Sequence, residues 1–241
     1  MKYTYLTINI LTILFPFLFS FERRIAFATR WKYLFPAMAS TAAVFLVWDY
    51  FFTQWGVWGF TDAYITGIKI LGLPIEEMLF FFTVPYSCVF IYDAMNYAYP
   101  SATKYNTAAK YAGTMVAVVL PVLAIVFYNR LYTSVNAVVC LVLLALFVKF
   151  YKQKSGTFFR FYLVHLIPFF IVNGILTGTG PAQPVVWYNN AHNLGVRLIT
   201  IPVEDTLYSL SMMFMNIMLY EYFRQRFSNN KQSSKVKYDS F

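Results

Sequence analysis

Residues 74–93, PIEEMLFFFTVPYSCVFIYD, have a counterpart 128 positions later at residues 202–221, PVEDTLYSLSMMFMNIMLYE. Each stretch opens with a proline, and two adjacent carboxylates follow it just before a long apolar run. Ionisable groups in hydrocarbon-facing segments are costly to insert and usually mark function. The candidate catalytic residues are therefore the four acids of the two quartets: Glu76, Glu77, Glu204 and Asp205.

The composition indicates a membrane protein, since 59% of the residues are hydrophobic and only 12% are charged. Soluble domains carry about 25% charged residues. Apolar stretches recur at the length of about 20 residues that a membrane-spanning helix needs, and helices are expected because open sheet edges are not satisfied in lipid. The predicted spans are residues 3–20, 33–52, 74–93, 110–128, 131–149, 160–177 and 202–222.

The net charge of +9 raises the alternative of nucleic-acid binding, but the distribution of the charge argues against it. If residues 21–32 are cytoplasmic and the spans alternate from there, all basic residues fall on the cytoplasmic side except four. Those four are Lys2, Lys69, Arg130 and Arg197. The positive-inside rule accounts for this bias. It predicts a multi-pass protein of the inner (plasma) membrane with the N-terminus outside and the C-terminus in the cytoplasm, and no nucleic-acid partner.

The repeat extends beyond the acid quartets. At the same offset, residues 3–20 align with 131–148 and residues 33–52 align with 161–180, which leaves the span 110–128 unpaired. The expected fold is an all-α integral membrane protein, with seven transmembrane helices in a 3+1+3 arrangement of two repeats. The expected divisions are a first repeat at 1–100, a linker helix at 101–130, a second repeat at 131–224 and a disordered cytoplasmic tail at 225–241.

Four crossings separate equivalent positions, so the two repeats are parallel and related by a pseudo-two-fold axis along the membrane normal. Both acid quartets then lie at one depth, near the outer ends of their helices. Proline fits the first turn of a helix, where the helix dipole favours negative charge. Solvated acids at the membrane surface are the simpler alternative. The sequence also leaves open whether the halves share one cavity or keep one site each.

A buried carboxyl pair handles protons, because desolvation and like charge leave a neutral acid beside an ionised base. Aromatic faces stabilise cations, although aromatic belts are also routine at membrane interfaces. Together these features suit protonation of an alkene, carbocation cyclisation and proton loss. The aromatic residues near the quartets are Trp48, Trp55, Trp58, Phe80, Phe81, Phe82, Trp187, Tyr188 and Tyr208.

The two quartets with their flanks resemble the paired signature of the small membrane lycopene cyclases, in the fused tandem-repeat bacterial form. The resemblance covers residues 3–222 and includes the preceding G-I-K and G-V-R. It implies cyclisation of the linear ends of lycopene to β-ionone rings, without net redox change, in carotenoid biosynthesis. It further implies that among Glu76, Glu77, Glu204 and Asp205 one acid protonates the terminal double bond and another removes the final proton.

The implied partners are lycopene or a related linear carotenoid, membrane lipid and, by association, other enzymes of carotenoid biosynthesis. We expect no cofactor. Gly174, Gly178 and Gly180 follow a membrane helix rather than a strand, so they do not fit a dinucleotide-binding motif. His165 and His192 have no second histidine at metal-ligand spacing, so we expect no metal. His165 is interpreted as a packed core residue.

Several further residues are candidates for binding substrate or orienting an acid, against the alternative of ordinary helix-end polarity. They are Asp49, Lys69, Phe80, Asn173, Asn190, Arg197 and Tyr208. Lys69 and Arg197 stand seven positions before their acids, as ion-pair partners or as interfacial anchors. Asp93 and Glu221, at the inner helix ends, are predicted to be solvated.

The main alternative function is a small-solute transporter, because some small carriers share the 3+1+3 plan with parallel repeats. In a transporter the intramembrane carboxylates would bind protons or solute. A sugar carrier is expected to have polar groups at mid-membrane in both halves. The middles of these spans consist mostly of Phe, Leu, Val and Met, which suits a polyene better.

Overall fold

The computed structural model describes residues 2–99 and 106–238. Each span predicted from the apolar pattern coincides with one α-helix. The helices are α1 (Thr4–Phe19), α2 (Trp31–Gln54), α3 (Ile75–Ala98), α4 (Asn106–Val126), α5 (Leu131–Tyr151), α6 (Ser155–Leu176) and α7 (Glu204–Tyr238). The all-helical fold class is therefore confirmed, and the first residues of the predicted linker, 101–105, lie outside the described residues.

Within the described residues, four helical stretches are long and apolar enough to cross a membrane. They are Phe27–Gln54, Ile75–Ala98, Thr107–Val126 and Leu131–Leu176, the last of which contains both α5 and α6. Helix α1 is apolar but shorter. These helices fit a membrane protein.

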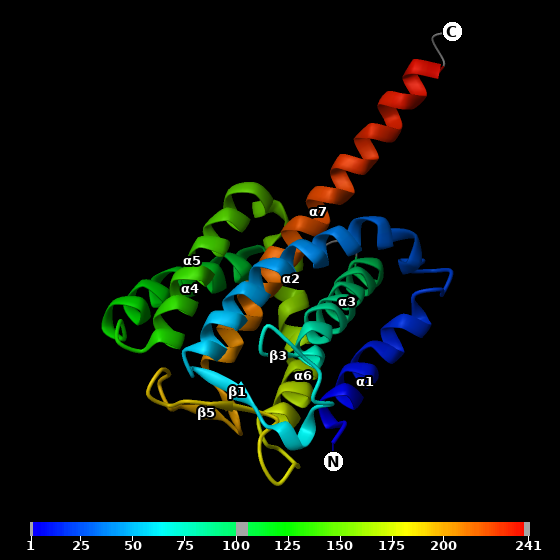
Figure 1. Cartoon of the computed structure of the whole chain (residues 1–241). Coiled ribbons are helices and arrows are strands. Elements are labelled where there is room, and N and C mark those ends of the chain that lie inside the picture. Colours follow the sequence, from blue (N-terminus) through cyan, green and yellow to red (C-terminus); the bar gives the residue numbers. More distant parts are fainter. Residues whose placement is uncertain (1, 100–105, 239–241) are drawn as a thin grey trace.

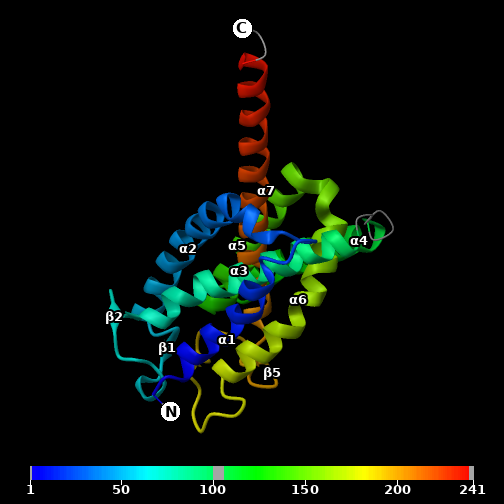
Figure 2. The ribbon, with the colours of Figure 1, turned by 90° about the vertical axis from the view of Figure 1, so that its right-hand side faces the viewer.

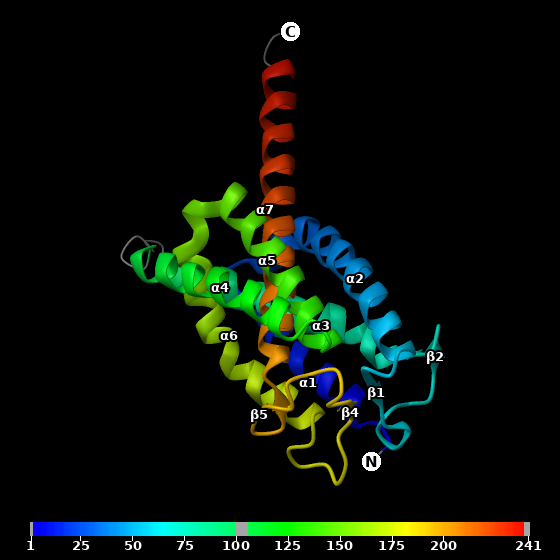
Figure 3. The same ribbon diagram turned by 90° about the vertical axis from the view of Figure 1, so that its left-hand side faces the viewer.

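The helices form one bundle in which the two repeats pack against each other (Figures 1 and 2). Helix α3 packs on α1 and α2, and α7 packs on α5 and α2. Helix α4 lies outside this arrangement against α5 and α6, as Figure 3 shows. Helix α6 completes the bundle by packing on α3.

Short strands gather at the end of the bundle where α3 and α7 begin, which we call the strand end (Figure 1). The helical prediction did not anticipate them, because two- and three-residue strands carry little periodic signal. They are β1 (Trp58–Phe60), β2 (Lys69–Ile70), β3 (Leu73–Pro74), β4 (Val186–Tyr188), β5 (Arg197–Leu198) and β6 (Ile201–Pro202). Strand β2 pairs with β3, β5 pairs with β6, and β1 pairs with β4 across the two repeats.

The β1–β4 pair has local two-fold symmetry. Its antiparallel register centres on Gly59 opposite Trp187, which are equivalent positions of the two repeats. Position 59 requires glycine, because a Cβ there would lie 2.4 Å from the indole of Trp187 on the opposite strand. Leu71 and Ile199, in the two equivalent hairpins, share a positive φ of 53° and 64°, which is uncommon for residues other than glycine. The repeat is therefore preserved down to individual backbone conformations.

Equivalent contacts correct the predicted alignment of the flanking helices. Asn9 donates its side-chain amide to the Glu76 carbonyl at 2.9 Å, and Asn136 does the same to Glu204 at 2.7 Å. The α1–α5 offset is therefore 127, so the predicted match of 3–20 with 131–148 is wrong by one residue. The difference reflects loop lengths, which change at little energetic cost.

Helices α2 and α6 are equivalent at an offset of 124, not at the predicted 128. Arg30, just before α2, forms an ion pair with Asp93 at 2.6 Å, and Lys154, just before α6, forms one with Glu221 at 2.5 Å. The loop after α6 is correspondingly longer than the loop after α2. At this offset Asn173 of α6 is the counterpart of Asp49 of α2.

The prediction that Asp93 and Glu221 are solvated is wrong, because both side chains are buried. Tyr92 donates to Glu221 Oε1 at 3.0 Å, and Tyr220 donates to Asp93 Oδ2 at 2.5 Å. The two bonds are exchanged reciprocally between α3 and α7. A buried carboxylate is tolerated where it is paired and hydrogen-bonded, so these groups join the two repeats at the end opposite the strands.

Helix α7 continues well beyond the bundle and carries the C-terminus away from the strand end (Figure 1). It remains helical to Tyr238, whereas the sequence predicts a disordered tail from residue 225. A helix nucleated by a packed segment can add polar residues without a second nucleation step. Hydropathy alone does not predict such a polar extension of a helix. Residues 239–241 of the predicted tail lie outside the described residues.

Candidate active site

The two acid pairs lie in the first turns of α3 and α7. In each repeat a proline that ends a short strand, Pro74 of β3 or Pro202 of β6, stands two residues before the first acid. Proline at this place fixes the entry of the chain into the helix. Neighbouring residues on a helix point about 100° apart, since there are 3.6 residues per turn. The two carboxylates of one pair therefore face different surroundings, and the structure separates them in the same way in both repeats.

The first acid of each pair binds the loop that precedes its helix. Glu76 Oε1 accepts the backbone N–H of Thr66 at 2.6 Å, and Glu204 Oε1 accepts that of Leu194 at 2.7 Å. Thr133 donates to the same oxygen of Glu204 at 2.6 Å. Both side chains are buried, and neither lines the main cavity. Their geometry is that of groups that hold the loops in place.

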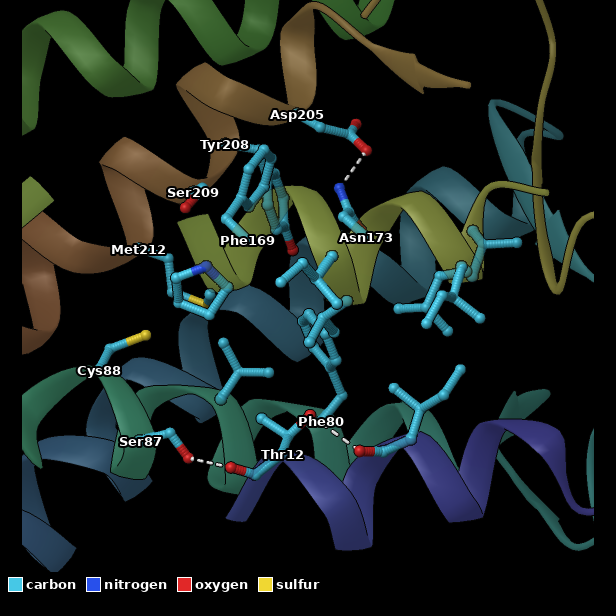
Figure 4. A pocket seen from close by; sticks show the side chains of 18 of the residues that line it. Thr12, Phe80, Ser87, Cys88, Phe169, Asn173, Asp205, Tyr208, Ser209 and Met212 are labelled. Carbon is cyan, nitrogen blue, oxygen red and sulfur yellow. Dashed lines mark hydrogen bonds between the residues drawn. The ribbon is translucent and has the colours of Figure 1, made fainter. Parts of the chain in front are cut away.

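The second acid of each pair faces a single cavity of about 530 Å³ that both repeats build. Glu77 enters it from α3, Asp205 enters it from α7, and Asp49 of α2 is a third carboxyl in its wall. Figure 4 shows part of this cavity, with α7 and α6 on one side and α3 and α1 on the other. The structure therefore has one shared cavity between the repeats.

On the first side, Glu77 has one hydrogen-bond donor among the described residues and a carboxyl neighbour. The Tyr5 hydroxyl donates to Glu77 Oε2. Asp49 is buried, lies close enough for its charge to act on Glu77, and accepts the Trp58 indole N–H at 2.5 Å. Two carboxyls in one low-dielectric site repel each other when both are ionised, so they favour a shared proton.

On the second side, Asp205 accepts three hydrogen bonds. Tyr132 donates to Oδ1 at 2.6 Å, while Tyr188 and Asn173 donate to Oδ2 at 2.9 and 2.8 Å. Burial and then the charge of Asp205 raise the pKa of the Tyr188 phenol, so it remains a donor. Hydrogen bonds to the charged form of a carboxylate stabilise that form, and this arrangement suits an ionised Asp205.

Aromatic rings line the cavity beside the carboxyls. Phe80 and Tyr208 occupy equivalent positions of the repeats and both contribute to its wall. Phe80 packs against Tyr5 with ring centroids 6.4 Å apart, and Tyr208 packs against Trp58 at 6.0 Å. Aromatic faces attract a cation within about 6 Å, so a positive charge formed near the carboxyls meets both rings and anions.

Farther from the strand end the cavity has mostly apolar lining residues and one polar cluster. His165 is buried as predicted but lines the cavity as well, with Nε2 2.8 Å from Ser209 Oγ and Nδ1 3.3 Å from Cys88 Sγ. Figure 4 shows Cys88, Ser209 and Met212 at this end, away from Asp205. Asn173 lies eight residues along α6 from His165, which is about 12 Å of helix.

Three of the residues predicted to bind substrate or orient an acid lie outside the cavity. Lys69 is paired with Asp62 at 2.8 Å rather than with a quartet acid. Arg197 donates to the Asn190 side chain at 2.8 Å and lies over the Tyr188 ring, 5.5 Å from its centroid. Arg197 therefore contacts Tyr188, and Asn190 is bound to Arg197, whereas Lys69 is paired away from the cavity carboxyls.

Sequence reasoning missed the tyrosines that donate to the acids. Tyr5 and Tyr132 are equivalent and bond equivalent carboxylates. Their match appears at an offset of 127 and disappears at 128, so a separate alignment of each helix would have found it. Trp58 and Tyr188 were noted only as aromatic surroundings, although each donates a hydrogen bond to a cavity carboxyl.

A model of the lycopene cyclase family matches the chain at residues 2–95 and 129–223. The two matched segments are the two repeats, and α4 lies between them. No curated protein and no solved structure matches the chain. Within the described residues, no group of three or more His, Cys, Asp or Glu side chains is arranged to hold a metal ion.

Proposed function

The chain belongs to the lycopene cyclase family, and from that premise we propose that it is a lycopene β-cyclase. It converts the linear ends of lycopene, or of a related carotenoid, to β-ionone rings by acid catalysis. The observation that carries this proposal is the shared cavity, which has three carboxyls at its strand end and mostly apolar walls beyond them. An acid site that continues into an apolar passage suits a hydrocarbon with a reactive end.

Glu77 is the proposed proton donor, with Asp49 as the group that keeps it protonated. The pair has a single phenol donor, from Tyr5, and two mutually repelling carboxyls. Glu77 gives its proton to the terminal double bond of the polyene, and the two electrons of that bond form the new C–H bond. A tertiary carbocation and the Glu77 carboxylate result.

Ring closure then moves the positive charge within the substrate. The next suitable double bond attacks the carbocation, forms the ring C–C bond and leaves the charge on a ring carbon. Phe80 and Tyr208 face this charge, and Asp205 is its proposed base. Asp205 removes a proton from the adjacent ring carbon, and the electrons of that C–H bond restore a ring double bond. One proton enters and one leaves, so the reaction is an isomerisation.

Glu76 and Glu204 are proposed as positioning residues. Each holds the backbone N–H of its loop and thereby sets the helix rotation that turns the next acid into the cavity. A rotation of one residue would exchange the roles of the two acids. The signature of two adjacent carboxylates thus serves two purposes at each quartet.

We further propose that all seven helices cross the membrane as two parallel triplets joined by α4, with the strand end outside and the C-terminus in the cytoplasm. The bias of basic residues supports this orientation. The family match favours the cyclase over the transporter.

Expression in a bacterium that accumulates lycopene tests the proposed function. We expect the extracted pigment to contain carotenoids with β rings, detected by chromatography and absorption spectra. A strain carrying the Glu77→Gln/Asp205→Asn variant is the matched control, since both changes keep the shape of the side chain and remove the proposed acid and base. Unchanged lycopene in the strain that expresses the intact protein would refute the proposal.

A further inference from the structure

The main cavity opens sideways between α1 and α6, two helices that lie side by side with few direct contacts (Figure 2). Leu11 and Phe15 of α1 and Ile171 of α6 line the cavity, yet their side chains are 62%, 59% and 61% exposed. Exposed apolar side chains of membrane-crossing helices face lipid. We call this opening the α1–α6 seam.

The pseudo-symmetric position, between α2 and α5, is filled by aromatic side chains. Phe52 of α2 and Trp58 of β1 pack on Tyr132 of α5, with ring centroids 6.3 and 5.1 Å apart. Trp48 of α2 packs on Tyr208 at 5.0 Å. These rings form one cluster with Val57 and Leu131, so the α2–α5 seam is closed where the α1–α6 seam is open.

Three substitutions between the repeats account for this difference. At the offsets established by the ion pairs and by the β1–β4 register, the aromatic residues that fill the α2–α5 seam correspond to aliphatic residues in the other seam. Trp48, Phe52 and Trp58 correspond to Val172, Leu176 and Val186, and all three aliphatic side chains line the cavity. Replacing a ring by a branched aliphatic chain leaves unfilled space.

We infer that the α1–α6 seam is the entrance through which a linear carotenoid slides sideways from the lipid, and that its unreacted polyene lies in this seam during the reaction. This inference rests on the proposed function. Pockets for small ligands measure about 300–1,000 Å³, so a cavity of about 530 Å³ suits one end of a carotenoid. The remainder of the chain needs an apolar path continuous with the cavity, and the seam provides it.

Tryptophan substitutions at the mouth of the seam test the inference. Leu11→Trp and Ile171→Trp place a large ring over the opening at positions that are exposed already. Ile10→Trp and Ile167→Trp are the matched controls, because these neighbours are 53% and 65% exposed and do not line the cavity. Initial rates are measured with purified protein in vesicles that contain increasing fractions of lycopene.

We expect the two seam variants to raise KM by about tenfold with little change in kcat, because they hinder entry and leave the acids in place. The control variants keep wild-type KM. Val172→Trp, which copies the ring of the closed seam, is expected to remove most activity while the protein stays folded and monodisperse. Val172→Ile, the conservative change at the same position, keeps most activity.

The outcomes separate the inference from the proposed function. If the wild-type protein forms no cyclised carotenoid in vesicles or cells, the proposed function fails, whatever the seam variants do. If the wild-type protein cyclises lycopene and the Leu11→Trp and Ile171→Trp variants keep its KM, the seam is not the entrance and the inference is overturned. Equal rises in KM for seam and control variants would also overturn it, since the effect would then not depend on the opening.

Discussion

The two repeats hold their first acids alike and their second acids differently. Glu76 and Glu204 accept equivalent backbone N–H groups, and this shared use explains why both quartets keep a glutamate there. Glu77 has one donor and a carboxyl neighbour, whereas Asp205 has three donors. The duplication has thus preserved the scaffold of the acid pairs while the environments of the cavity-facing acids have diverged.

One pair of equivalent positions contributes directly to this divergence. Asp49 on α2 and Asn173 on α6 correspond at an offset of 124, and both line the cavity. An amide donates a hydrogen bond that favours an ionised neighbour, whereas a carboxyl disfavours a second negative charge. In the proposed mechanism, this difference between a carboxyl and an amide helps to make one repeat the proton donor and the other the proton acceptor.

Removing the two cavity-facing acids is expected to have the largest effect. Glu77→Gln and Asp205→Asn each remove a proton-transfer group while keeping its shape, so we expect kcat to fall by about 10²- to 10⁴-fold. The measurement is β-ring formation by purified variants in lycopene-loaded vesicles. Asp62→Asn, an exposed acid at the same end of the bundle, is the control and keeps full activity. Near-normal turnover by either cavity variant would contradict the proposed acid–base pair.

Exchanging the neighbours of these acids tests the comparison more directly. Asp49→Asn gives Glu77 an amide neighbour, and Asn173→Asp gives Asp205 a carboxyl neighbour. We expect each change to lower kcat by about 10- to 100-fold, since a shift of one pKa unit in either group is worth about 1.4 kcal/mol. Rates are compared across pH with those of the wild type. If both variants retain the rate and pH profile of the wild type, Asp49 and Asn173 do not set the roles of Glu77 and Asp205.

Replacing the first acid of each pair, Glu76 or Glu204, is expected to affect the stability of the protein more than its catalytic rate. Glu76→Gln and Glu204→Gln keep an oxygen that accepts the loop N–H but lose the charge that strengthens the bond. We expect the free energy of unfolding to fall by about 1–3 kcal/mol and kcat to fall less than tenfold. Thermal unfolding in detergent and initial rates are the measurements. A loss as large as that of Glu77→Gln, with unchanged stability, would assign Glu76 a direct part in catalysis.

The sequence was sufficient for predicting the helices and the repeat, but not for predicting which acid of each quartet faces the cavity. Apolar runs indicate helices because a helix that crosses a membrane needs about 20 consecutive apolar residues. The recurrence of residues 74–93 at 202–221 identified the repeat and drew attention to its four acids. Which acid of Glu76–Glu77 faces the cavity depends on helix rotation, and packing against the loop sets that rotation. Tyr5 and Tyr132 escaped notice because loops of unequal length shift the offset by one residue.

The contrast between the two seams was also beyond the sequence alone. Trp48 and Val172 are equivalent only at the α2–α6 offset, which the ion pairs of Arg30 and Lys154 reveal. Without that register, Trp48 reads as one more aromatic residue of a membrane interface. The position of a ring relative to a groove is a property of the packed bundle.

The smallest effect is expected from single donors, and it sharpens the contrast between the acids. Tyr188→Phe leaves Asp205 with Tyr132 and Asn173 as donors, so we expect kcat to fall by only about two- to tenfold, the equivalent of one net hydrogen bond. Because burial and the Asp205 charge raise the pKa of Tyr188, its phenol stays protonated up to about pH 10, the ordinary pKa of tyrosine.

The wild type and Tyr188→Phe should therefore share the same high-pH limb of the rate profile. Tyr5→Phe removes the phenol donor to Glu77, and its matched variant in the other repeat is Tyr132→Phe, which removes one donor to Asp205. An ionised base depends on its donors more than a protonated acid does, since hydrogen bonds to the charged form are the stronger ones. If Tyr5→Phe lowers kcat more than Tyr132→Phe, the charged group is Glu77, and the proposed donor and acceptor exchange places.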